Sequence, residues 1–185
     1  MERQTAYVLM KNADQESLAA FFAAYGDIAV TPAGPDLFRL SYAGAQDDAD
    51  LRRVRELAVQ EFIQDLTVFV VPAAADYPVA AVLKELPRLG HGIYGAAEIA
   101  TEAVMRDLSG LHRTLRDYYV GLVGAETVDT AVGFIRADQN ASRAARALYM
   151  HRNTLNYRLD HFLAKTGIDV RTFTGGLAVY LLFRH

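Results

Sequence analysis

The stretch NASRAARALYMHRNTLNYRLDHFLAKTG, residues 140–167, has the pattern of two helices joined by a tight turn. Asn140 and Ser142 are residue types that cap helix N-termini, so a short helix is expected to begin there. The dipeptide MH then supplies the turn, and a second helix is expected over about Arg152–Thr166, with Gly167 as its C-cap. Small and apolar residues follow with the spacing of a helix-turn-helix unit: Ala145, Met150, Leu155 and Leu159.

The second helix of this unit is expected to bury one face and expose the other. Its apolar residues repeat at i, i+4, i+7 and i+8, which places them on one face: Leu155, Leu159, Phe162 and Leu163. Asn153, Tyr157 and His161 lie roughly opposite, with Thr154 and Asn156 at the flanks. The leucines are therefore predicted to pack, while the polar side chains face outward at the helix N-terminus, the end that usually enters a major groove.

The outward side chains carry the donors and acceptors that DNA recognition requires. Arginine can bond guanine and asparagine can bond adenine through paired hydrogen bonds, while Thr, Tyr and a helix N-terminus suit phosphates. The residues predicted to contact base edges are Arg152, Asn153 and Asn156. The residues predicted to contact phosphates or to position the helix are His151, Thr154, Tyr157, Arg158 and Arg143. Asp160 would repel phosphates, which limits the expected contact to the first two turns.

The charge of the chain is divided by segment. Residues 136–185 hold 8 Lys and Arg against 3 Asp and Glu, a net charge of +5, whereas residues 1–135 hold 11 against 19, a net charge of −8. This asymmetry suggests two roles, with the basic one at the C-terminal end. The composition, 52% apolar and 22% charged, is typical of soluble globular proteins.

Residues 1–72 alternate between the hydrophobic periods of strands and helices. Strands are expected at 5–10 and 67–72, helices at 14–25 and 47–66, and two short strands around a turn at Pro32–Pro35. The resulting order is β-α-β-β-α-β. It predicts a ferredoxin-like or related split βαβ sandwich, ending before the sequence AAADYP at 73–78.

After this boundary the chain reads as helical to its end. A long helix from Glu98 would place apolar residues at spacings of four and three, as in a coiled-coil seam: Val104, Leu108, Leu111, Leu115, Tyr118 and Leu122. The seam is shorter than three heptads, so a dimer contact and packing within its own domain fit it equally well. The predicted domains are residues 1–72, an α/β domain; 73–120, a helical connector and possible dimerisation helix; and 121–185, a helix-turn-helix domain.

Several motifs of other protein classes fail on their context. GHGIYG at 90–95 matches G-x-G-x-x-G, but a phosphate-binding loop follows a strand and this one follows helical sequence, so a connecting turn is expected. The five histidines form no pair at metal-ligand spacing, and the chain contains no cysteine. No enzyme activity, cofactor or metal is therefore predicted. Without a signal peptide or a membrane-length apolar run, a cytoplasmic protein is expected.

The C-terminal sequence resembles the DNA-binding domain of the PucR/CdaR-type transcriptional regulators over about residues 95–185. The signature of that domain is an Ala-x-x-Leu helix, a His-Arg-Asn-Thr-Leu-x-Tyr-Arg-Leu recognition helix, Thr-Gly-(Leu/Ile)-Asp and a terminal leucine-rich helix. Its counterparts here are Ala145 and Leu148, His151–Leu155 with Tyr157–Leu159, Thr166–Asp169, and Leu177–Leu182. The resemblance implies a transcriptional regulator with an unknown small-molecule effector, if it has one. It also allows the α/β part to be a shortened GGDEF-like domain without cyclase chemistry.

The sequence thus predicts an α+β protein in which a βαββαβ sandwich, ferredoxin-like or shortened GGDEF-like, precedes an all-α helix-turn-helix domain. It is expected to bind double-stranded DNA, as a homodimer, without a membrane-embedded part. The alternative is a small-molecule-binding or protein-interaction module whose helix-turn-helix is degenerate. Tyr149, where such units often have glycine, favours that alternative, as do Asp160 and the acidic remainder of the chain.

Overall fold

The computed structural model describes the backbone of residues 3–43 and 48–184 and the side chains of residues 3–43 and 53–184. Within these ranges the chain forms two compact units, which are described separately below. Residues 3–71 and 86–95 belong to the first unit, and residues 72–85 and 96–184 belong to the second. The division into domains at residues 72 and 120 stays a prediction about the roles of the segments.

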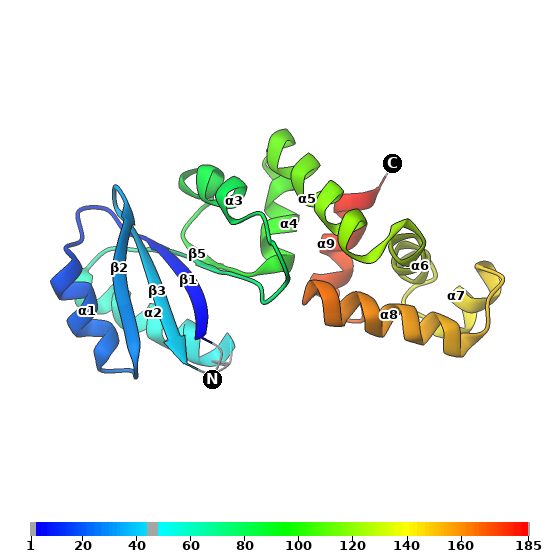
Figure 1. The fold of residues 1–185 in the computed structure, drawn as a ribbon, viewed down its shortest axis with the longest axis horizontal. Coiled ribbons are helices and arrows are strands. Elements are labelled where there is room, and N and C mark those ends of the chain that lie inside the picture. The colour runs from blue at the N-terminus through cyan, green and yellow to red at the C-terminus, as the bar shows by residue number, and fades with distance from the viewer. Residues whose placement is uncertain (1–2, 44–47, 185) are drawn as a thin grey trace. The chain divides into compact units, whose positions relative to one another are not determined.

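The first unit is built on a five-stranded sheet with the strand order β2-β3-β1-β4-β5 (Figure 1). The first four strands pair antiparallel in the order of a ferredoxin-like sandwich, whereas β5 runs parallel to β4. The predicted βαββαβ order is therefore confirmed. The elements of this unit are β1 (Arg3–Leu9), α1 (Gln15–Ala23), β2 (Ile28–Gly34), β3 (Leu37–Ala43), α2 (Asp48–Phe62), β4 (Thr67–Val70), the 3-10 turn η1 (Leu86–Arg88) and β5 (Gly92–Tyr94).

One face of this sheet carries the core of the unit. Successive strand residues point to opposite faces, so the apolar side chains that alternate along a strand gather on one side. Ala6 and Val8 of β1 are buried there, paired with Leu40 and Phe38 of β3. Both helices contribute to the same buried cluster and therefore cover the same face of the sheet: Leu18 and Phe22 from α1, and Ala58 from α2.

Two details of the first unit differ from the sequence-based expectation. The turn between β2 and β3 lies at Pro35–Asp36, because the strand continues through Pro32 and Gly34 with a register shift. Proline is tolerated there because β2 is an edge strand. The segment GHGIYG is also more than a connecting turn. Its Gly92–Tyr94 pairs with Thr67–Phe69 as β5, a strand too short to give a periodic signal.

The second unit is helical throughout the residues that the structure describes. Helix α8 packs against α5, α6 and α7, and α9 packs against α4, α5 and α6. These contacts place most of the apolar residues of α5 and α9 in the interior. The elements of this unit are α3 (Val79–Glu85), α4 (Ala96–Met105), α5 (Ser109–Val123), α6 (Ala125–Arg136), α7 (Ala141–Ala147), α8 (Arg152–Thr166) and α9 (Phe173–Phe183).

The long helix expected from Glu98 is in fact two helices. α4 ends in a turn that places Asp107 in the left-handed region, with φ 53°, and the Leu108 N–H donates to the Ala103 carbonyl at 2.9 Å. The coiled-coil seam is therefore interrupted. Leu111 and Leu115 are 3% and 0% exposed within the second unit, so these side chains pack inside their own domain and cannot form the dimer contact.

Candidate nucleic-acid interface

Helix α7 begins and ends as the sequence indicates. The Asn140 side chain caps it, accepting hydrogen bonds from the backbone N–H groups of Ser142 and Arg143 at 3.1 and 3.0 Å. At the other end the Tyr149 N–H donates to the Arg146 carbonyl at 3.3 Å, and the Met150 N–H donates to the Ala145 carbonyl at 3.0 Å. This pair of bonds is a Schellman turn, which satisfies carbonyls at the helix end and redirects the chain.

Tyr149 occupies the left-handed position of this turn. Its φ is 52°, in the region where glycine is favoured and other residues are strained by roughly 1–2 kcal/mol. The side chain is 98% exposed, so the tyrosine is accommodated without displacing any packed group. The turn that usually contains glycine is therefore formed with tyrosine in this chain.

Helix α8 begins at its own cap and ends at a glycine. The His151 Nδ1 accepts a hydrogen bond from the Asn153 backbone N–H at 3.2 Å. Gly167 has a φ of 72°, and its N–H donates to the Leu163 carbonyl at 2.8 Å. The predicted bounds, Arg152–Thr166 with Gly167 as the C-cap, are confirmed. With Nδ1 accepting this bond, the neutral imidazole carries its N–H at Nε2.

One face of α8 is buried as the helical periodicity predicts. Leu155, Leu159 and Phe162 are at most 1% exposed. Leu163 was expected on the same face but is only half-buried. This face lies against α5, α6 and α7 and fixes the orientation of the helix.

The opposite side of the first turn of α8 is open to solvent. His151, Arg152, Asn153 and Thr154 are all exposed. Tyr157, one turn further, is 72% exposed, and its ring stacks on His161 with the centroids 6.5 Å apart. The predicted site residues that are exposed at the start of α8 are called here the α8 polar surface: His151, Arg152, Asn153, Thr154 and Tyr157. Asn156 is half-buried at its flank.

Two of the predicted arginines are already paired within the protein. Arg158 donates to the Glu126 carboxylate at 2.8 Å and to the Thr130 hydroxyl at 3.2 Å, so its guanidinium ties α8 to α6. Arg143 forms an ion pair with Asp138 at 2.7 Å, and both side chains are more than half exposed. Arg158 therefore links α8 to α6, whereas the Arg143 side chain is more than half exposed.

Further interactions that sequence reasoning missed hold the loop after α8. Arg171 pairs with Asp160 at 2.7 Å, so the carboxylate that seemed to oppose DNA has a cationic partner. The Gln139 side-chain amide donates to the Val170 carbonyl at 2.8 Å and to the Thr172 carbonyl at 3.1 Å. These partners are separated by 11 or more residues in the sequence, so no local pattern could have predicted them.

A leucine side chain packs closely against a glycine of the same unit. A Cβ atom at Gly133 of α6 would lie 2.8 Å from a methyl carbon of Leu148, at the end of α7. A larger residue at Gly133 would force the Leu148 side chain to shift. Ala145 of α7 is buried, so small residues of both helices contribute to the packing of the unit.

The chemistry of the α8 polar surface is that of hydrogen bonding and charge. Among residues 3–43 and 53–184, no group of three or more His, Cys, Asp or Glu side chains is placed to hold a metal ion.

The pKa shifts found in the second unit belong to three tyrosines outside the α8 polar surface. Burial raises the pKa of the Tyr119 hydroxyl well above its ordinary value, in a cluster with Tyr77 and Tyr118 on α5 and before α3. Within the described residues, no helix is both long enough and apolar enough to cross a membrane.

Comparison with known proteins supports the resemblance found in the sequence. Residues 127–184 match the PucR C-terminal helix-turn-helix domain. The chain is 39% identical over 49 residues to the uncharacterized protein YxkF and 35% identical over 74 residues to the DNA-binding transcriptional activator AdeR, both of Bacillus subtilis (strain 168). The matches cover 26% and 40% of this chain but only 16% of each relative.

One solved structure aligns with nearly the whole of this chain. The crystal structure of a regulator of polyketide synthase expression from Bifidobacterium adolescentis aligns with a TM-score of 0.45 and 16% sequence identity. The alignment covers 98% of this chain and 80% of that chain.

Proposed function

We propose that this chain, in which residues 127–184 are a PucR-type C-terminal helix-turn-helix domain, is a transcriptional regulator that binds double-stranded DNA through α8. The observation that carries the proposal is the division of α8 into two faces. Leu155, Leu159 and Phe162 are buried, while the first turn presents donors and acceptors to solvent. A helix whose apolar face packs against its own domain and whose polar first turn is exposed can enter a major groove without rearranging that domain.

The side chains of the first turn suit different parts of a DNA duplex. Arg152 and Asn153 are exposed, and their side chains can form paired hydrogen bonds to guanine and adenine. His151 and Thr154 lie at the helix N-terminus, where the partial positive charge of the helix favours phosphate. The free Nε2–H of His151 would donate to a phosphate oxygen while Nδ1 keeps its cap. Asn156 is assigned to a base edge at the flank and Tyr157 to a phosphate.

Binding as a homodimer is part of the proposal. One helix-turn-helix covers little DNA, so tight specific binding usually needs two half-sites about one helical turn apart. Since Leu111 and Leu115 are buried, the two-fold contact must use another surface. The protein would then bind an operator with two related half-sites.

The alternative, a degenerate helix-turn-helix, rested on two residues in particular. Tyr149 adopts the left-handed conformation that the turn requires, so its presence does not disrupt the unit. Asp160 is paired with Arg171, which reduces its repulsion of phosphates. Both observations favour DNA binding over the alternative.

The test is the salt dependence of DNA binding by the full-length chain. Fluorescence anisotropy with a mixed-sequence duplex should show affinity at ~50 mM salt, with log K falling by about 0.9 per phosphate contact against log salt. Arg143→Ala should reduce the slope by about one contact. Arg113→Ala, an exposed arginine of α5, is the matched control and should change neither affinity nor slope. No binding by the folded chain at low salt would refute the proposal.

A further inference from the structure

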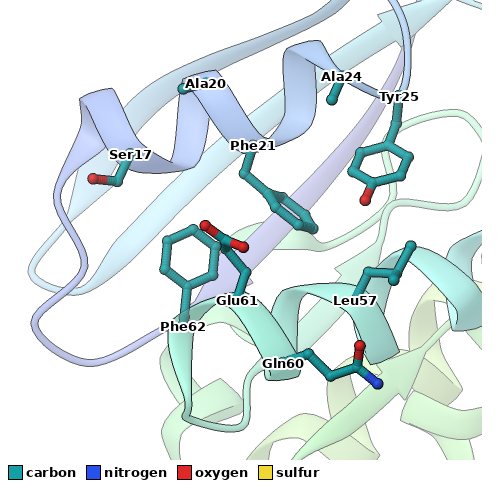
Figure 2. A pocket seen from close by; sticks show the side chains of 9 residues that line it. All are labelled: Ser17, Ala20, Phe21, Ala24, Tyr25, Leu57, Gln60, Glu61 and Phe62. Atoms are coloured by element: carbon teal, nitrogen blue, oxygen red, sulfur yellow. The ribbon is translucent and has the colours of Figure 1, made fainter.

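A groove between the two helices of the first unit has the features of a ligand site. It has a volume of about 800 Å³, within the range of small-molecule sites, and it is open on one side. Figure 2 shows Phe21 and Tyr25 entering this space from the side of α1, and Glu61 and Phe62 entering it from α2. The small side chains of Ala20 and Ala24 leave the α1 wall open. The remaining lining residues are Ser17, Leu57 and Gln60.

The floor of the groove is aromatic. The Phe21 ring lies 5.5 Å from the Phe62 ring and 5.1 Å from the Tyr25 ring, measured between centroids. Phe21 and Phe62 also pack against the core of the unit, and this contact holds the two rings in place. A held aromatic surface offers apolar contact and, at the ring faces, a negative electrostatic potential that attracts cations.

The charge of the groove is also negative. Glu61 is exposed in the last turn of α2, and none of the nine lining residues is basic. The described basic residues of α2, Arg53 and Arg55, lie outside the lining, and Arg55 pairs with Asp65. A helix C-terminus carries partial negative charge, so an acidic residue there is unfavourable for the helix itself. Helix stability therefore does not account for Glu61, whereas a bound cation would be attracted by the carboxylate and the helix end together.

We infer that this groove binds small organic ammonium compounds with an apolar or aromatic body. The ammonium group would lie at the Glu61 carboxylate and against the ring faces, and the apolar body would cover Phe21 and Phe62. Anions of the same size would be repelled by Glu61, and neutral analogues would gain only the apolar contact. The inference concerns the first unit alone and does not rest on DNA binding by the second.

The experiment measures binding of three probes of matched size to the full-length chain by isothermal titration calorimetry. The probes are 2-phenylethylammonium, 2-phenylethanol and phenylacetate, at equal ionic strength. The ammonium compound should bind most tightly and phenylacetate least. Because exposed ion pairs contribute little, Glu61→Gln should weaken ammonium binding by roughly two- to fivefold and leave 2-phenylethanol binding unchanged.

Matched variants locate the effect in the groove. Glu56→Gln removes an exposed carboxylate of α2 that does not line the groove, and it should leave all three affinities unchanged. Tyr25→Leu keeps an apolar side chain but removes a ring face, so it should weaken the ammonium compound more than the alcohol. Chemical-shift changes in a 15N-labelled protein should fall on residues of α1 and α2.

Several results would overturn the inference. These are equal or tighter binding of phenylacetate or 2-phenylethanol, an ammonium affinity that Glu61→Gln leaves intact, and no binding of the ammonium compound at millimolar concentration. If Glu61→Gln fails to fold by circular dichroism, the order of the three probes on the unaltered chain and the Tyr25→Leu variant decide. DNA binding is measured separately, so its failure and the failure of this site are distinguishable.

Discussion

Helices α5 and α8 of the second unit have the same length, fifteen residues, but begin in opposite ways. The N-cap residue of α5 is Leu108, which makes no side-chain cap and is buried, as is Leu111 in the first turn. His112 in that turn also bonds through Nε2 to the Leu182 carbonyl at 3.0 Å. α8 starts at His151, whose own side chain caps the helix, and the residues that follow are exposed.

The comparison shows how a helix end becomes available to a ligand. The first turn of any α-helix has N–H groups without partners inside the helix. In α5 the apolar residues around that turn, Leu108 and Leu111, pack into the domain core, and the exposed residues between them are only Ser109 and Gly110. In α8 a local cap stabilises the turn while its side chains stay free. The N-terminus of α8 can therefore bind a partner without loss of folding stability.

The largest effect is expected from charges placed in the buried face of α5. Leu111→Asp with Leu115→Asp should unfold the second unit, because each unpaired buried carboxylate costs more than about 4 kcal/mol. Circular dichroism and thermal unfolding would measure the loss of structure. A folded monomer from this double variant would show that these leucines form an intermolecular contact instead.

A smaller effect is expected at the buried face of α8. Leu155→Ala should lower the free energy of unfolding by about 2–5 kcal/mol, because it leaves a cavity at a fully buried position. Chemical denaturation would measure this change. Leu163→Ala is the control. Leu163 is expected on the same face of α8 but is only half-buried, so this variant should lower the free energy of unfolding by clearly less.

The polar face of the same helix should show the opposite pattern. Asn153→Ala or Arg152→Ala should change stability by no more than about 0.5 kcal/mol, as at other exposed positions. Each should weaken binding to the specific operator by about 1–3 kcal/mol and relax the preference at one base pair. Binding affinities for the operator and for single-base-pair variants of it would measure the loss of affinity and the relaxed base preference. If Asn153→Ala unfolds the domain while Leu155→Ala does not, the two faces of α8 have been assigned wrongly.

The smallest expected effect separates the two roles of His151. His151→Ala should lose the cap, which costs roughly 1 kcal/mol of stability. Asn is itself a good cap, so His151→Asn should restore the stability that the alanine variant loses. The asparagine variant lacks the Nε2 donor and should still bind DNA more weakly. Equal DNA affinity for His151→Asn and the unaltered chain would limit His151 to capping.

Much of the fold follows from local patterns. The strands and helices of residues 3–70 appear in the predicted order, because alternation of apolar residues at period two or at helical spacing is a property of neighbouring residues. Local patterns fail where an element is short or a break is subtle. β5 has three residues, and the interruption at Asp107 lies inside an otherwise regular apolar spacing.

The bounds of α8, its C-cap at Gly167 and the buried positions of Leu155 and Leu159 follow from local sequence, since capping and periodicity act within a few residues. It also indicated which polar residues begin that helix. The packed fold was needed to show that Arg158 is held by Glu126 and Thr130, that Arg171 pairs with Asp160, and that the α5 leucines face inward. It alone brought Phe21 of α1 and Glu61 of α2 to one groove. The physical reason is that such partners lie 11 to 40 residues apart, and only the packing of whole helices brings them together.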